Sequence, residues 1–166
     1  GINNRKVYPK DSQAGGTWIA CKDNGTAAVL LNGAFKKHIP SPPYKRSRGL
    51  VFLEILDAAN PVKHFTEISL NEIEPFTMII LDESLHECRW DGIVKHCSVL
   101  NKSSSYIWSS ATLYDDTAVA KRKQWFNAFR KENPSPGLED ILHFHQFTGD
   151  GDISNDLKMN RTGVLY

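Results

Sequence analysis

The sequence predicts an α+β fold, in which antiparallel strands and helices come in separate blocks along the chain. Three patterns predict it. Residues 17–31 form two apolar strand-like runs around a turn, residues 50–69 carry apolar side chains at helical spacing, and residues 76–100 form three further strand-like runs. The sequence shows neither an alternating βαβ order, which would indicate a parallel sheet, nor an internal repeat.

The first strand pair is predicted by the runs TWIACK (17–22) and TAAVLL (26–31). The intervening turn, Asp-Asn-Gly at 23–25, consists of residues that tolerate positive φ. We therefore expect a β-hairpin over 17–31. The polar stretch before it, residues 1–13, shows no pattern of a helix or a strand.

Two helices are predicted next. Ser47 is a suitable N-cap, and the apolar stripe over 50–58 has helical spacing. Asn60 followed by Pro61 ends this helix, because the residue before a proline disfavours helical geometry. Pro61 itself suits the first turn of a second, short helix over 61–69.

Three more strands are predicted after Pro75. FTMIIL (76–81) is continuously apolar, which is typical of a strand covered on both faces. LHECRW (85–90) and IVKHCSVL (93–100) flank an Asp-Gly turn, so we expect a three-stranded antiparallel unit. Residues 103–114 are predicted to form a short strand that runs into a loop.

The last part of the chain is predicted to be mainly helical. Residues 115–133 form a long amphipathic pattern, and a shorter helix is expected over 138–147. Residues 148–163 are polar and turn-rich, and an apolar strand-like run has only begun where the sequence stops. The side chains expected to point inward from the long helix are Val119, Trp125, Phe126 and Phe129.

Composition excludes several partners. With 20 Lys and Arg against 19 Asp and Glu, the net charge of +1 provides no basic footprint for nucleic acid or an acidic membrane. No apolar run approaches the roughly 18 residues that span a bilayer. Cys21, Cys88 and Cys97 are an odd number without CxxC spacing, which favours free thiols, a reducing compartment and a cytoplasmic location. Cys21 stands within an apolar run and is expected to be buried and inert.

Two groups of residues resemble metal ligands but favour another interpretation. His143 and His145 are two apart, and on a helix such a pair points to different faces. In the second group each His and its neighbouring Cys alternate between the faces of a strand, so core cysteines with partly exposed histidines are favoured over a tetrahedral site. This second group is His86, Cys88, His96 and Cys97.

The turn DGDISND (150–156) has the carboxylates of a calcium loop. It lacks the glycine at the sixth position, and Arg161 stands where the twelfth position needs a carboxylate. An acidic, hydrated turn is therefore favoured. The sequence predicts no metal and no cofactor.

Several segments in fixed order resemble the NRDE family, the transport and Golgi organisation 2-like proteins. The GGTW hairpin is the most specific of them, and together they span nearly the whole chain. The segments are AGGTWIACKDNGTAAVLLN, SRGLVFLEIL, PFTMIIL, WSSATLYDDTAVAKRKQWF and HFHQFTGDGDISNDLKMNRTG.

The resemblance implies a fold similar to the N-terminal nucleophile hydrolases, an αββα sandwich of two antiparallel sheets between helical layers. In such enzymes an N-terminal cysteine attacks an amide carbonyl and its own α-amino group is the base. The family's N-terminal Cys and Asn-Arg-Asp-Glu segment are not found in residues 1–166. We therefore expect a single NRDE-like domain, truncated at both ends and inactive without its nucleophile.

The resemblance also implies site residues. One group would line the rim of a pocket, where glycines allow a ligand to approach the backbone. Asn32 matches an amide donor of the hydrolases, Ser110 stands where relatives have Asn, and Arg161 is a candidate binder of an anionic group. The rim group is Gly15, Gly16, Thr17 and Trp18.

Two functions are implied for the full-length protein. The first is hydrolysis of a linear amide by an N-terminal nucleophile. The second is a nonenzymatic carrier or chaperone of an apolar anionic ligand, such as haem or lipid. In both cases the expected partner is a small molecule. A general interaction module is a third possibility.

Overall fold

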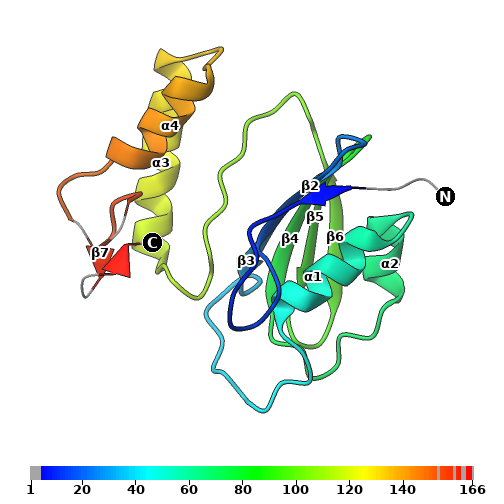
Figure 1. Cartoon of the computed structure of the whole chain (residues 1–166). Helices are drawn as coiled ribbons and strands as arrows, with labels where there is room; N and C mark the ends of the chain where they lie inside the picture. Colours follow the sequence, from blue (N-terminus) through cyan, green and yellow to red (C-terminus); the bar gives the residue numbers. More distant parts are fainter. Residues whose placement is uncertain (1–4, 153, 159, 162–163, 166) are drawn as a thin grey trace. The chain divides into compact units, whose positions relative to one another are not determined.

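The computed structural model describes residues 5–152, 154–158, 160–161 and 164–165 (Figure 1). By its internal contacts the chain divides into two compact units. The first comprises Gly1–Ser105 with Ser110–Leu113, and the second comprises Tyr106–Ser109 with Tyr114–Tyr166. Each is described separately below.

The first unit is built on a six-stranded sheet in which every neighbouring pair is antiparallel and the strands lie in chain order. The predicted hairpin and the predicted three-stranded unit are both confirmed, and the α+β prediction with them. The strands are β1 (Lys6–Val7), β2 (Ile19–Lys22), β3 (Ala27–Asn32), β4 (Phe76–Leu81), β5 (Leu85–Trp90) and β6 (Lys95–Leu100).

Strand β1 was not expected from the polar start of the sequence. It is only two residues long, too short to show the alternation of a strand. Its position depends on a partner distant in sequence, because Arg5 and Asp23 exchange two hydrogen bonds. The Arg5 amide donates to the Asp23 carboxylate at 3.2 Å, and the Asp23 amide donates to the Arg5 carbonyl at 3.0 Å.

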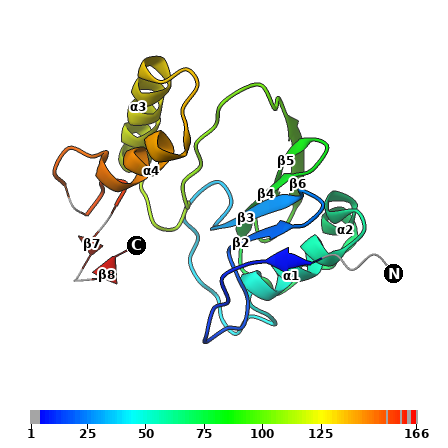
Figure 2. The same ribbon diagram turned by 45° about the horizontal axis from the view of Figure 1, so that its top comes forward.

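Helices α1 (Arg48–Asp57) and α2 (Pro61–Glu67) pack on one face of the sheet (Figure 2). Both helices begin as the sequence predicts. The Ser47 side chain accepts a hydrogen bond from the Leu50 amide, and the Asn60 side chain accepts one from the Lys63 amide with Pro61 at the first helical turn.

The core lies between these helices and the sheet. Phe52, Ile55, Leu56 and Phe65 of the helices are fully buried. From the sheet, alternate residues of β2 to β5 enter this core, as the period of a strand requires. They are Ala20, Ala28, Leu30, Phe76, Met78, Ile80, Cys88 and Trp90.

A close contact between two glycines fixes α1 against the chain that enters β2. A Cβ at Gly16 would lie 2.6 Å from the carbonyl carbon of Gly49, and a Cβ at Gly49 would lie 2.9 Å from the Thr17 nitrogen. Real Cβ atoms do not approach backbone this closely, so both positions need glycine. The second glycine of the GGTW segment therefore serves helix packing.

The strand predicted within residues 103–114 is absent from the structure, which describes all of this segment. Part of it instead docks on the end of β3, because the Ala111 amide donates to the Asn32 carbonyl at 3.0 Å. This single bond and the serine contact described below replace a strand ladder. Apolar residues in a short segment predict burial but not the partner that buries them.

The second unit contains two helices, α3 (Asp116–Glu132) and α4 (Leu138–Phe147), and two short paired strands, β7 (Asn160–Arg161) and β8 (Val164–Leu165). Both helices were predicted. They meet through Phe144, which is buried and whose ring centroid lies 4.7 Å from that of Phe129 and 6.0 Å from that of Phe126.

The inward face predicted for α3 is only partly correct. Val119, Trp125, Phe126 and Phe129 are half-buried, whereas the buried residues of this helix are Ala118 and Arg122. The Arg122 guanidinium lies 3.6 Å from the centre of the Tyr114 ring, and it donates to the Asp156 carbonyl at 2.9 Å. A guanidinium can be buried when an aromatic face and an acceptor replace its water.

None of the helices in the described part of the chain is long and apolar enough to cross a membrane. The second sheet layer of the resembled sandwich and the single-domain organisation stay predictions.

The glycine contact gives a stability prediction. Gly49→Ala should lower the free energy of unfolding by about 2 kcal/mol, because the added Cβ would meet backbone atoms that cannot move aside like a side chain. Helix propensity alone predicts the opposite effect, an increase in the free energy of unfolding of up to about 1 kcal/mol. Urea unfolding measures the difference. The control is Gly137→Ala, where the nearest atom to the new Cβ is 3.6 Å away. A stabilised Gly49→Ala protein would contradict the prediction.

A second prediction concerns the turn between β5 and β6. The amide of Val94, the His96 ring and the amide of Ile93 donate to the Asp91 carboxylate and lower its pKa from 3.8 to about 2. A lowered folded-state pKa stabilises the fold above the ordinary value, and this contribution is lost as pH falls through 3.8 towards 2. Because Asp91 is exposed to solvent, we expect less than about 1 kcal/mol.

Asp91→Asn tests this, because it keeps an oxygen acceptor for the turn but removes the charge. The difference in unfolding free energy between the two proteins should be largest near neutral pH and should shrink as the pH is lowered below 4. Urea titrations at several pH values measure it. A difference independent of pH would show that the charge of Asp91 has no role.

Candidate functional site

The predicted rim segment begins with a tight turn closed by Asp11. The Asp11 carboxylate accepts hydrogen bonds from the amides of Gln13 at 2.8 Å and Ala14 at 3.0 Å. The bonds from Ala14 and Gln13 lower the pKa of Asp11. Gly15 follows with a φ of +71°, a conformation that favours glycine, and no atom lies within 4 Å of where its Cβ would be.

The rest of the rim segment is divided between packing and exposure. The backbone of Gly49 occupies the space beside Gly16. Thr17 is buried, and its hydroxyl donates to the Ile19 carbonyl at 3.1 Å. Trp18 is 52% exposed and is available to a ligand or partner. Gly15 and Trp18 are therefore the open positions of the segment, and a ligand-contacting role for the four residues stays a prediction.

The structure brings together the two residues predicted to be catalytic. Ser110 is buried, and its hydroxyl donates to the backbone carbonyl of Asn32 at 2.9 Å. The Thr112 hydroxyl lies 3.1 Å from the same oxygen of Ser110. The Ser110 hydroxyl is thus engaged in holding residues 110–113 on the end of β3. The half-buried side chain of Asn32 makes no hydrogen bond among the described residues.

A network that sequence reasoning missed lies beside this pair. Thr77 is buried in β4, and its hydroxyl donates to the Gly33 carbonyl at 3.0 Å. The Arg89 guanidinium donates to the Thr77 hydroxyl at 3.1 Å and to the Ala34 carbonyl, and it pairs with Glu87 at 2.9 Å. Thr77 and Arg89 are cross-strand neighbours, so only the register of β4 and β5 reveals the network. Its polar groups are satisfied internally.

Arg161 stands in the two-residue strand β7. Its side chain lies outside the described residues, so its proposed role in anion binding stays a prediction.

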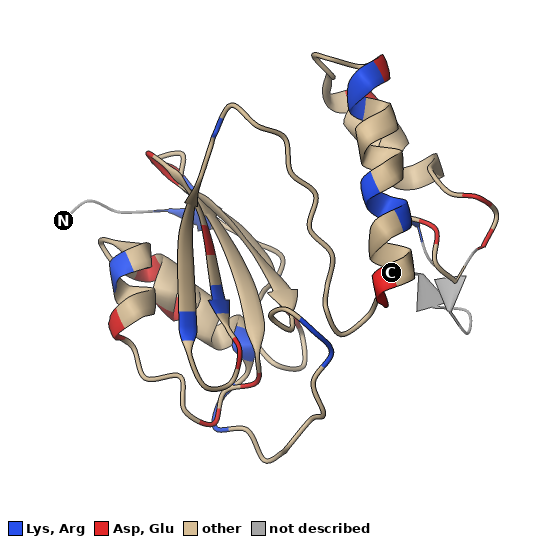
Figure 3. Cartoon of the chain, turned by 180° about the vertical axis from the view of Figure 1, so that it is seen from behind, with Lys and Arg blue, Asp and Glu red and all other residues tan. Residues whose placement is uncertain are grey.

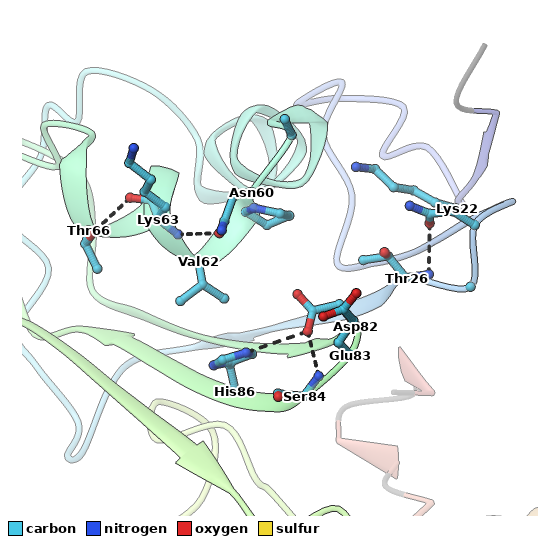
Figure 4. Close-up of a pocket in the computed structure, with 14 residues that line it drawn as sticks. Lys22, Thr26, Asn60, Val62, Lys63, Thr66, Asp82, Glu83, Ser84 and His86 are labelled. Carbon is cyan, nitrogen blue, oxygen red and sulfur yellow. Dashed lines mark hydrogen bonds and ion pairs between the residues drawn. The ribbon is translucent and has the colours of Figure 1, made fainter. Parts of the chain in front are cut away.

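A large cleft lies at the opposite end of the sheet. Its volume is about 1030 Å³, and three parts of the first unit form its walls (Figure 4). The β2–β3 turn provides one wall, the start of α2 a second, and the β4–β5 turn with the first part of β5 a third. The lining residues are Lys22, Asn24, Gly25, Thr26, Ala59, Asn60, Pro61, Val62, Lys63, Thr66, Asp82, Glu83, Ser84 and His86.

Lys22 is the least exposed charged residue of the cleft. The residue as a whole is only 8% exposed, and its amine reaches solvent without an ion pair or hydrogen bond among the described residues. Lysines commonly bury the methylene stem while the charged amine stays in water. Lys22 reaches this position because β2 alternates, and Ala20 two residues earlier lies in the core. Lys22 thereby lines the cleft.

The other charged groups of the cleft have partners or face water. Lys63 is mostly exposed and lies 3.8 Å from Glu67. The Asp82 carboxylate accepts from the Ser84 amide at 2.8 Å and lies 3.6 Å from the His86 ring. The cleft thus combines the amine of Lys22, unpaired among the described residues, with the carboxylates of Asp82 and Glu83. Elsewhere on the chain, Lys and Arg are interspersed with Asp and Glu (Figure 3).

The suspected metal ligands do not converge. Cys88 and Cys97 are cross-strand neighbours on the face that α1 and α2 cover, whereas His96 lies on the other face with its ring 2.7 Å from Asp91. No group of three or more His, Cys, Asp and Glu side chains in the described part of the chain could hold a metal ion.

The acidic turn after α4 binds its own backbone and one lysine. Asp156 accepts from the Asp150 amide at 2.9 Å, and Asp152 accepts from the Ser154 amide at 3.1 Å. The Asp150 carboxylate pairs with Lys121 at 2.7 Å, which lowers the pKa of Asp150 and raises that of Lys121. These contacts use the carboxylates that a calcium loop would need.

Exposure of the cysteines differs from the sequence-based expectation at Cys21 and Cys97. Cys21 is exposed rather than buried, because its side chain lies on the face of β2 opposite Ala20 and Lys22. Cys97, expected to be a core cysteine, is exposed on the edge strand β6. No base with a hydrogen bond to the Cys21 thiol is found in the described residues.

Comparison with known families identifies the chain's relatives. The chain belongs to the Transport and Golgi organisation 2 family, whose model matches residues 3–149. The resemblance seen in the sequence is therefore confirmed. A search of the curated proteins gave no match. Family membership by itself assigns neither a hydrolase nor a carrier activity.

The Ser110 contact gives a prediction. Ser110→Ala should lower the free energy of unfolding by about 1 kcal/mol, the net contribution of one hydrogen bond, because the Asn32 carbonyl keeps its bond from the Ala111 amide. Urea unfolding measures the effect. The control is Ser98→Ala on the exposed part of β6, which should change stability by less than about 0.5 kcal/mol. Equal stability of the Ser110→Ala and Ser98→Ala proteins would argue against a structural role for Ser110.

Proposed function

We propose that the protein binds a small, polar, anionic molecule in the cleft between α2 and the β2–β3 and β4–β5 turns. The observation that supports this most strongly is the Lys22 amine, which reaches solvent from a largely buried side chain on the cleft wall and has no partner among the described residues. An anionic group would form a charge-assisted hydrogen bond with this amine, which no described residue does.

The residues that line the cleft limit the kind of ligand that can bind there. The apolar side chains of the cleft are few, namely Ala59, Pro61 and Val62, and the rest of the lining is polar or charged. Asp82 and Glu83 favour hydrogen-bond donors on the ligand. We therefore replace the apolar anion of the carrier hypothesis, such as haem or lipid, with a polar molecule that carries a carboxylate or phosphate and a separate hydrogen-bond donor.

A binding experiment tests this with defined probes. Succinate, inorganic phosphate and hexanoate would be titrated into ¹⁵N-labelled protein, with hexanamide as the uncharged match for hexanoate. The largest chemical-shift changes of backbone amides should occur at residues 22–26, 59–66 and 82–86. Shift changes that hexanoate causes and uncharged hexanamide does not are those that depend on the anionic charge. Lys22→Met should weaken anion binding by at least about tenfold, because a charge-assisted hydrogen bond contributes about 1.5–3 kcal/mol.

Lys63→Met is the matched control. Lys63 lines the same cleft but is mostly exposed and lies near Glu67, so its loss should change affinity by less than about threefold, under 1 kcal/mol. Equal effects of the Lys22 and Lys63 changes, or shifts centred on another part of the chain, would overturn the proposal.

Amide hydrolysis is a second candidate, favoured by one observation. The Asn32 side chain ends β3 half-buried and without a hydrogen bond among the described residues, so its amide could donate to an oxyanion. Because Asn32 and Lys22 lie at opposite ends of the sheet, two variants separate the functions. In a protein that carries the family's N-terminal cysteine, turnover of a linear amide that is lost in Asn32→Leu but kept in Lys22→Met would support the hydrolase. Ligand binding that is lost in Lys22→Met but kept in Asn32→Leu would support the carrier.

We further propose that the protein works in the cytoplasm. The support is that Cys21, Cys88 and Cys97 are all free thiols, the resting state expected in a reducing compartment. Expression of the tagged protein in intact cells with organelle markers tests this. Co-localisation with a secretory compartment would contradict it.

A further inference from the structure

Two cysteines face each other across the last strand pair of the first unit. Cys88 in β5 and Cys97 in β6 are direct register partners, and their sulfur atoms lie 2.9 Å apart. Directly opposed residues of antiparallel strands have Cα atoms about 4.5–5.5 Å apart. That is within the range of about 4.4–6.8 Å that a disulfide bridges. The backbone is thus already placed for a bond between these sulfurs.

The two thiols differ in accessibility. Cys97 is exposed on β6, an edge strand of the six-stranded sheet, and external reagents can reach it. Cys88 is fully buried in the core. Burial, with the neighbouring Cys97 thiol, raises the pKa of Cys88 well above its usual value. Cys97 is therefore the thiol that reacts first, and Cys88 is inaccessible to reagents in solution and can react only through Cys97.

We propose that Cys88 and Cys97 are a redox modification site, which forms a reversible intramolecular disulfide by exchange with a low-molecular-weight disulfide such as oxidised glutathione. This inference does not depend on the ligand cleft or on the proposed function.

The exchange proceeds in two balanced steps. The Cys97 thiolate attacks one sulfur of oxidised glutathione, so that a mixed disulfide forms at Cys97 and the first glutathione leaves as a thiolate. Cys88 then gives up its proton and attacks the Cys97 sulfur, which forms the Cys88–Cys97 bond and releases the second glutathione. In total, the protein dithiol loses two electrons and two protons, and glutathione disulfide becomes two thiols.

The second step is the slower one. Only the thiolate attacks, and the raised pKa of Cys88 keeps it protonated. The short distance between the sulfurs compensates, because the attack is intramolecular. A transient mixed disulfide at Cys97 is therefore expected before the bridge appears.

The bridge would act on the edge of the sheet. Among the described strands, β6 pairs only with β5, and its Lys95 donates to the carbonyls of Thr66 and Ile68 at the end of α2. A covalent link at Cys97 would hold β6 on β5 and so suppress opening of this edge. Amide hydrogen exchange in β6 should become several-fold slower after oxidation.

Mass spectrometry tests the proposal in a Cys21→Ser protein, which removes the remaining exposed thiol. After incubation with oxidised glutathione, the protein should lose the mass of two hydrogen atoms, and a peptide map should contain a Cys88–Cys97 link that a reducing agent removes. A glutathione adduct that persists on Cys97, or two thiols that remain unmodified while Cys21 of the parent protein reacts, would overturn the proposal.

Two variants separate the roles of the cysteines. Cys88→Ser should stop the reaction at a stable glutathione adduct on Cys97, and Cys97→Ser should leave Cys88 unmodified. Wild-type Cys21 is the matched control, an exposed thiol that can form an adduct but has no partner thiol for a bridge. Modification of Cys88 in the Cys97→Ser protein would contradict the order of the steps. The Cys21→Ser result decides the proposal even if the core variant Cys88→Ser does not fold.

Discussion

The pairing of β3 with β4 is the constraint on which the first unit depends. Six register pairs, from Ala27 with Leu81 to Asn32 with Phe76, join the hairpin to the three-stranded unit although residues 33–75 separate them. This register decides which side chains face α1 and α2. A shift by one residue would put Leu30 and Met78 on opposite faces of the sheet and divide the core. The same pairing fixes the two ends of the sheet, where the two candidate sites lie.

Each end of the sheet leaves a polar side chain without a partner among the described residues. At the Asn32 end, the side chains of Ser110, Thr77 and Arg89 donate to backbone carbonyls, whereas the neutral Asn32 side chain makes no hydrogen bond with the described residues. At the other end, the charged amine of Lys22 reaches solvent without a partner in the described part of the chain. A group that the fold leaves unsatisfied is a better indicator of a ligand than one that already stabilises the fold. The proposed function centres on the cleft because Lys22 carries a charge and Asn32 does not.

The three cysteines show how position in the sheet sets reactivity. Cys21 and Cys97 are exposed, and Cys88 is buried. All three lie in strand-like segments of the sequence, so the sequence alone does not predict a difference in their reactivity. Pairing of β5 with β6 places Cys97 on Cys88, whereas Cys21 has no thiol opposite it, since Val7 and Ala27 are its register partners. The chemistry of a thiol here follows from its cross-strand neighbour.

The sequence by itself determined the α+β class, the extent of α4, the N-cap of α1, the start of α2, the strands β2 to β6 and the family. These depend on local signals, such as Ser47, Pro61 and the Asp-Gly turn, or on motifs such as GGTW. Tertiary structure alone decided that Gly16 packs on Gly49, that residues 110–113 dock on β3, that Arg122 is buried under Tyr114, and that Lys22 shares a cleft with α2 and the β4–β5 turn. Each of these joins residues far apart in the chain, and a single sequence carries no local signal of such a contact.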